Sequence, residues 1–247
     1  MVKLLRRALL ILALAILAFT TGRLYPVLRR PPLVLHQDAV VADVDPAQTS
    51  VSYNPDLGGF IDVAPQGGFD TLLIFYPGGL VRPQAYEWLG VALTPYGVRT
   101  LIPVFPFDLA VTAPNRAEKL LSLSEGKNVV VGGHSLGGAM AARFALRYPE
   151  AVTGLVLIGA FSAESDDLST LPLDVLILAA EHDGLVTLAE VRAGLTRLPE
   201  TSQLTVIEGS VHSFFGRYGP QRGDGLPSVT RAAAERQITA ALRGFLR

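Results

Sequence analysis

Ser135 stands at the centre of the segment Gly133-His134-Ser135-Leu136-Gly137. A serine hydroxyl is a weak nucleophile unless the fold holds it on an exposed turn beside a general base and oxyanion donors. A Gly-x-Ser-x-Gly turn between a strand and a helix supplies the exposed position, because its glycines let the two elements approach closely. In such a turn the amide after the serine, here that of Leu136, points to the place where an oxyanion forms. Ser135 is therefore the candidate nucleophile.

A candidate acid and a candidate base follow downstream. Asp183 comes just after the apolar run Asp174–Ala180, and His212 comes just after the run Leu204–Gly209. Parallel sheets keep their functional residues at the carboxyl ends of the strands, so both side chains are expected at the sheet edge that carries Ser135. Histidine is the most common general base, and a carboxylate orients its ring and stabilises its cation. The sequence thus predicts a triad of Ser135, Asp183 and His212.

Other polar residues compete for these roles. The alternative triad acids follow an earlier apolar run and are Glu164, Asp166 and Asp167. His134 either orients the turn or carries a proton, and His182 is a candidate substrate contact. We interpret Asp224, between two glycines, as a turn residue and His36 as a surface or strand residue.

The second oxyanion donor is expected in the loop Pro77-Gly78-Gly79-Leu80, which follows the apolar run Thr71–Tyr76. Glycines in this place let a backbone N–H approach the substrate carbonyl without a Cβ in the way. The candidates are the amides of Gly79 and Leu80, and the sequence does not choose between them.

From Asp70 onward, apolar runs alternate with helical patterns such as 81–96 and 115–123. This alternation predicts an α/β fold in which a mostly parallel sheet carries helices on both faces. Only residues 161–173 connect the apolar run 152–158 with the apolar run 174–180. This connection is too short for a helical cap over the site. The substrate pocket is therefore expected to be open, with walls formed by residues 105–111 and by Phe214 and Phe215.

The strongest motifs resemble the alpha/beta-hydrolase superfamily, and more narrowly its small single-domain members, the alpha/beta-hydrolase fold-5 and dienelactone-hydrolase-like group. These motifs are Tyr76–Val81, Gly132–Gly138, Asp183–Thr187 and His212 with Phe214–Gln221. The chain order Ser, Asp, His is also the order of that superfamily. The resemblance covers the chain from about Asp70 to the C-terminus and implies hydrolytic chemistry by the same three residues. Dienelactone hydrolases carry cysteine where this chain has Ser135, which leaves the substrate open.

Composition excludes several classes of function. The chain has 247 residues, of which 49% are hydrophobic, so one sizeable catalytic domain is expected. A net charge of −1 without a basic cluster argues against a nucleic-acid partner. The absence of cysteine excludes disulfides, thiolate catalysis and Cys-based zinc sites. We expect a small-molecule ester substrate, no cofactor and no metal; the sequence does not predict the oligomeric state.

The N-terminus resembles a targeting segment. Lys3, Arg6 and Arg7 precede the apolar run 8–19, and this order predicts an uncleaved single-span anchor or a cleaved signal peptide, with an amphipathic or buried helix as the third alternative. With an anchor or a signal peptide, the catalytic domain is expected outside the cytoplasm. The predicted organisation is an anchor or signal segment at 1–24, a linker with the first edge strands at 25–69, and a catalytic domain at 70–247. Within 25–69, strands are expected at 33–35 and 39–41, with a turn at 54–59.

Overall fold

The computed structural model describes residues 6, 10–14, 22 and 32–246, and it divides the chain into the units Met1–Pro32 and Leu33–Arg247. In the first unit, residues 10–14 are helical, with exposed apolar side chains. Among the described residues, no helix is both long enough and apolar enough to cross a membrane. Most of the predicted anchor or signal segment, 1–24, lies outside the described residues, and the segment remains a prediction.

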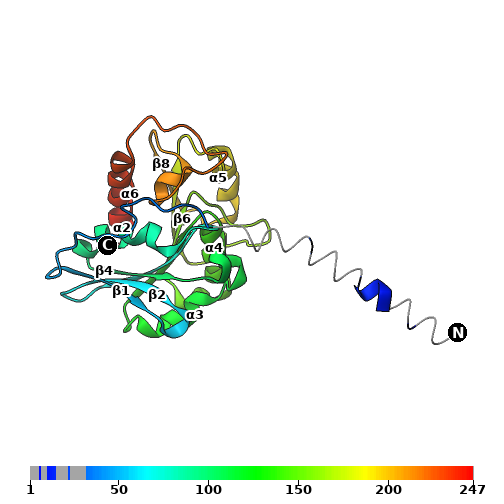
Figure 1. Cartoon of the computed structure of the whole chain (residues 1–247), viewed down its shortest axis with the longest axis horizontal. Coiled ribbons are helices and arrows are strands. Elements are labelled where there is room, and N and C mark those ends of the chain that lie inside the picture. The colour runs from blue at the N-terminus through cyan, green and yellow to red at the C-terminus, as the bar shows by residue number, and fades with distance from the viewer. Residues whose placement is uncertain (1–5, 7–9, 15–21, 23–31, 247) are drawn as a thin grey trace. The chain divides into compact units, whose positions relative to one another are not determined.

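An eight-stranded sheet forms the centre of the second unit (Figure 1). Its strands are β1 (Thr49–Asn54), β2 (Phe60–Pro65), β3 (Thr71–Tyr76), β4 (Val98–Pro103), β5 (Asn128–His134), β6 (Gly154–Ile158), β7 (Asp174–Ala180) and β8 (Gln203–Ile207). Their spatial order is β1-β2-β4-β3-β5-β6-β7-β8. Strand β2 pairs antiparallel with β1 and β4, and all other pairs are parallel. The predicted mostly parallel sheet is confirmed.

Helices cover both faces of the sheet, as predicted. Side chains of β3 alternate between two hydrophobic clusters, so that Leu72 and Ile74 enter one and Leu73 and Phe75 the other. The first cluster packs against α3 (Arg116–Leu120), α4 (Leu136–Arg147) and α5 (Leu188–Gly194), and the second against α2 (Glu87–Leu93) and α6 (Arg231–Phe245). Burial on both faces explains why the central strands are continuous apolar runs.

The predicted helix at 81–96 is divided. A 3₁₀ turn at Pro83–Tyr86 precedes α2, and another at Thr94–Tyr96 follows it. The predicted helix at 115–123 likewise consists of α3 and a 3₁₀ turn, Leu121–Leu123. Residues 159–173, all described, contain no helix, which confirms that no sizeable cap stands between β6 and β7.

The prediction of strands at 33–35 and 39–41 is wrong. Residues 33–44 form an irregular strap with only one bridge pair, Leu35 with Tyr218, and the antiparallel edge strands are β1 and β2. The amide of Leu33 donates to the carbonyl of Leu80 at 2.7 Å, and that of His36 donates to the carbonyl of Arg217 at 3.0 Å. The backbone groups of the strap form hydrogen bonds with distant loops, so the strap belongs to the compact unit Leu33–Arg247.

Candidate active site

Ser135 occupies a strained turn between β5 and α4. Its backbone angles are φ 53° and ψ −123°, and its amide donates to the carbonyl of Ile158 at 2.9 Å. A positive φ is costly for a residue with a Cβ and persists only where the surroundings enforce it. The residue is half-buried, so the fold holds a strained serine at a place that a substrate can reach.

The glycines of the turn are required by contact distances. A Cβ on Gly133 would lie 2.5 Å from the backbone carbon of Gly137. A Cβ on Gly137 would lie 2.2 Å from the carbonyl oxygen of Tyr76 at the end of β3. Strand β5, helix α4 and the loop after β3 therefore meet at backbone-to-backbone distance, and this contact holds the turn against the sheet.

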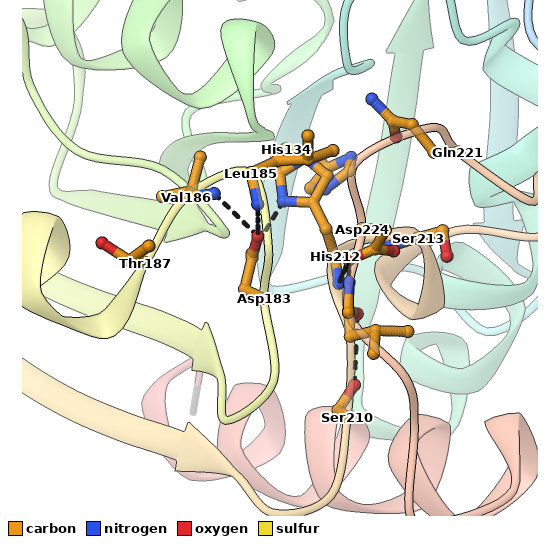
Figure 2. Close-up of polar contacts among 12 residues, drawn as sticks. His134, Asp183, Leu185, Val186, Thr187, Ser210, His212, Ser213, Gln221 and Asp224 are labelled. Atoms are coloured by element: carbon orange, nitrogen blue, oxygen red, sulfur yellow. Dashed lines mark hydrogen bonds and ion pairs between the residues drawn. The ribbon is translucent and has the colours of Figure 1, made fainter.

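Asp183 and His212 form a buried pair at the same sheet edge. The Oδ2 atom of Asp183 lies 2.7 Å from Nδ1 of His212, and the two side chains are 0% and 1% exposed. The Oδ1 atom accepts hydrogen bonds from the amides of Leu185 and Val186 at 2.8 and 2.7 Å. Figure 2 shows the two amides and the histidine ring converging on this carboxylate. These contacts fix the carboxylate in place, and it in turn holds the ring of His212 in one orientation.

His212 lies close to the serine turn without a hydrogen bond to it. Among the described residues, Ser135 Oγ makes no hydrogen bond with His212. The ring of His134, which directly precedes Ser135, lies 4.4 Å from the ring of His212, centroid to centroid. A Cβ on Gly159, at the end of β6, would lie 3.2 Å from Nδ1 of His212. The ends of β5, β6 and β7 thus meet around His212, and hydrogen bonds between nucleophile and base often tighten only with substrate bound.

The loop after β3 brings one of the two candidate amides to the serine turn. The amide of Leu80 donates to the carbonyl of Asp108 at 2.7 Å, so it is already used. A Cβ on Gly79 would lie 3.3 Å from Cδ2 of Leu136, and within the described part of the chain the amides of Gly79 and Leu136 donate to no acceptor. The amides of Gly79 and Leu136 are therefore the better candidates for the two oxyanion donors.

Asp224 binds the backbone at His212, a contact that the sequence did not reveal. Its Oδ1 accepts from the amide of His212 at 2.9 Å, and its Oδ2 accepts from the amide of Ser213 at 2.8 Å. Gly225 packs against His182, because a Cβ there would lie 1.7 Å from the carbonyl oxygen of that residue. The loop of Asp224 thus joins the loops of Asp183 and His212, whereas the Gly-Asp-Gly pattern alone indicated only a turn.

Replacing Asp224 with alanine is expected to lower kcat by about 10- to 100-fold, because the amides of His212 and Ser213 each lose an anchoring acceptor and the ring of His212 is no longer held in place. The melting temperature should fall as well, since two buried amides lose their partner. Asp167→Ala is the matched control, because exposed Asp167 also accepts from a nearby amide, that of Ser169. Equal kinetics for both variants would show that Asp224 does not position the histidine.

The alternative candidates for the acid and for the histidine roles make their contacts elsewhere. Asp166 pairs with Arg143 at 2.9 Å. His182 lies 3.5 Å from the hydroxyl of Ser228 and 4.0 Å from a carboxylate oxygen of Glu181. His36, in the strap, contacts Arg231. The pKa of His36 is lowered, mainly by burial and next by the charge of that arginine. The remaining alternative acids, Glu164 and Asp167, are exposed.

Two aromatic residues of the predicted pocket wall are core residues. Phe105 packs edge-on against Tyr76 in one hydrophobic cluster, and Phe215 is 1% exposed in the other. Phe214 is half-buried and lines a cavity of about 400 Å³ together with Val211 and Asp224. Phe107 is exposed, so it remains a candidate for contact with substrate.

Comparisons with known proteins agree with this architecture. The profile of the Alpha/beta hydrolase family matches residues 72–236, which include Ser135, Asp183 and His212. No curated protein matches the sequence. The crystal structure of a "predicted CIB-like hydrolase" from Thermoplasma acidophilum superposes with a TM-score of 0.62 at 16% identity, covering 79% of this chain and 99% of that one. That likeness supports the fold, and the family match covers most of the chain. The chain therefore belongs to the alpha/beta hydrolase family, and its fold is that of a hydrolase.

Proposed function

We propose that this protein is a serine hydrolase that cleaves carboxylic esters through an acyl-enzyme. The observation that carries the proposal is the buried 2.7 Å pair of Asp183 and His212 beside the strained turn of Ser135. An activated serine requires a base, a group that orients the base, and oxyanion donors. This sheet edge contains a residue for each of these requirements.

In the proposed reaction, Nε2 of His212 removes the proton from Ser135 as Oγ attacks the ester carbonyl carbon. Asp183 holds the Nδ1–H tautomer and stabilises the imidazolium. The amides of Gly79 and Leu136 donate to the oxyanion of the tetrahedral intermediate. Collapse of that intermediate breaks the ester C–O bond, and His212 protonates the departing alcohol. Water then attacks the acyl-enzyme with His212 again as base, which releases the acid and restores Ser135.

We also propose that the catalytic unit is tethered to a membrane, or exported, with its site outside the cytoplasm. The support comes from the sequence, in which Lys3, Arg6 and Arg7 precede the apolar run 8–19. Fractionation of cells that express the full chain tests this proposal, since a tethered protein stays with membranes after a high-salt wash and an exported one appears in the soluble extracytoplasmic fraction. Recovery in the cytoplasm would contradict both forms.

Turnover of p-nitrophenyl esters with and without an added alcohol tests the reaction. We expect a burst of nitrophenol equal to the enzyme concentration or continuous turnover, with free acid as the main acyl product. The Ser135→Ala variant is the control for non-enzymatic hydrolysis. An acyl product found mainly on the added alcohol would indicate an acyltransferase, and no acyl-enzyme in a folded protein would indicate a binding protein on this fold.

A further inference from the structure

His134 occupies the centre of the site. It is the last residue of β5, it directly precedes Ser135, and its side chain is fully buried. Four aromatic rings surround its imidazole, at centroid distances of 4.4, 5.6, 5.9 and 6.1 Å: His212, Phe215, Tyr86 and Tyr218. A polar ring in such a place loses its hydration, so its polar atoms need other partners.

A chain of hydrogen bonds reaches Nδ1 of this ring. The amide of Gly78 donates to the hydroxyl of Tyr86 at 3.0 Å, and that hydroxyl lies 2.8 Å from Nδ1 of His134. Burial raises the pKa of Tyr86, so the hydroxyl keeps its proton. The phenol oxygen can accept from Gly78 and donate its own proton to Nδ1; in that arrangement Nδ1 accepts and Nε2 carries the hydrogen.

The ring is also neutral. Burial, and then the neighbouring His212, lower the pKa of His134 well below its usual value. The other ionisable groups whose rings face it, Tyr86 and Tyr218, have raised pKa values, again mainly because of burial. The Nε2 atom is buried. His134 therefore has neither the charge nor the access that a proton carrier needs.

The same ring contacts the loop that carries the oxyanion donor. A Cβ on Gly78 would lie 2.9 Å from Nδ1 of His134 and 3.0 Å from the hydroxyl of Tyr86, so the loop rests directly on this pair. Gly78 precedes Gly79, and His212 lies against the same imidazole. A shift of the imidazole would thus displace the oxyanion donor and the base together.

We propose that His134 is a positioning residue, and that through Tyr86 it sets the oxyanion loop while its ring supports the ring of His212. The inference rests on the proposed function, because that function assigns Gly79 and His212 their roles. A residue that only filled space would need no buried hydrogen-bonding nitrogen and no tyrosine hydroxyl as the partner of that nitrogen. Here the polar pair links two functional loops that are far apart in the sequence.

Kinetics of three variants of the full-length protein test the inference. Tyr86→Phe and His134→Leu each break the hydrogen-bond chain, and each is expected to lower kcat by about 10- to 100-fold. KM should change by less than about threefold, because the lost alignment acts in the transition state. His134→Asn places an amide oxygen where Nδ1 stands and should recover much of the activity. Tyr148→Phe is the matched control, because it removes an exposed hydroxyl that bonds to Glu118.

The double variant Tyr86→Phe/His134→Leu separates positioning from simple packing. If the tyrosine acts through the imidazole, the double variant is no slower than His134→Leu alone, whereas independent effects would multiply. Wild-type kcat in both single variants, or fully multiplied losses, would overturn the inference. A wild-type protein whose Ser135 forms no acyl-enzyme would instead contradict the proposed function.

Nitrogen NMR of histidine-labelled, full-length protein decides the inference even without activity. We expect His134 to remain the neutral Nε2–H tautomer between pH 5 and 8. The Tyr86→Phe substitution should shift the resonances of His134 and of the Gly79 amide, while Tyr148→Phe should shift neither. A His134 that titrates in this range, or a Gly79 amide that Tyr86→Phe leaves unchanged, would overturn the inference.

Discussion

Replacing Asp183 with asparagine lowers kcat by about 10⁴-fold and leaves the fold intact. The amide oxygen of the new side chain takes over the two hydrogen bonds from the amides of Leu185 and Val186, so the NH₂ group faces Nδ1 of His212. A donor there forces Nδ1 to accept, which places the ring proton on Nε2. That nitrogen can then no longer remove a proton from Ser135.

Steady-state kinetics and circular dichroism check this expectation, with Asp166→Asn as the matched control. Asp166 is also buried and hydrogen-bonded, but it pairs with Arg143. The control should keep its activity. Near-normal turnover in Asp183→Asn together with a large loss in Asp166→Asn would move the triad acid to the segment after β6.

The second large effect concerns the fold of the serine turn. Replacing Gly137 with alanine should destabilise the protein by more than about 3 kcal/mol, since the added methyl cannot be accommodated by a side-chain rotation. The Cβ would lie 2.2 Å from the carbonyl oxygen of Tyr76 and 2.3 Å from that of Pro77. Either β3 and α4 separate, which opens the core, or the turn rebuilds and Ser135 leaves its strained conformation.

Urea unfolding and ester turnover measure both consequences. Gly244→Ala is the matched control, because Gly244 is an exposed residue of α6 and a Cβ added there would meet no atom within 4 Å. That variant should be stabilised by up to about 1 kcal/mol, as expected for alanine in a helix. A Gly137→Ala protein with wild-type stability and activity would contradict the close packing described for the turn.

Much of the sheet was predictable because its central strands are buried on both faces. The bounds of β3 and β7 coincide with the apolar runs 71–76 and 174–180, since polar residues or turns end each run. The relative placement of Ser135, Asp183 and His212 followed from one rule, that parallel strands present their carboxyl ends at one edge. The buried contact between Asp183 and His212 agrees with that rule.

Features that depend on contacts between distant residues were not predictable. The choice between Gly79 and Leu80 depends on the carbonyl of Asp108, in another loop. Residues 33–35 and 39–41 were predicted as strands because they are short apolar segments. The sequence of such a segment does not indicate which partners its backbone amides and carbonyls will bond to. The pairing of Tyr86 with His134 spans 48 residues, and no local pattern connects them.

The most direct test of the central claim is fluorophosphonate labelling of the full-length protein, with the adduct mapped by mass spectrometry. We predict one stoichiometric adduct on Ser135, which Ser135→Ala abolishes and which His212→Ala slows by several orders of magnitude. Labelling of another serine, or no labelling of the folded wild-type protein, would contradict the assignment of Ser135, Asp183 and His212 as a catalytic triad.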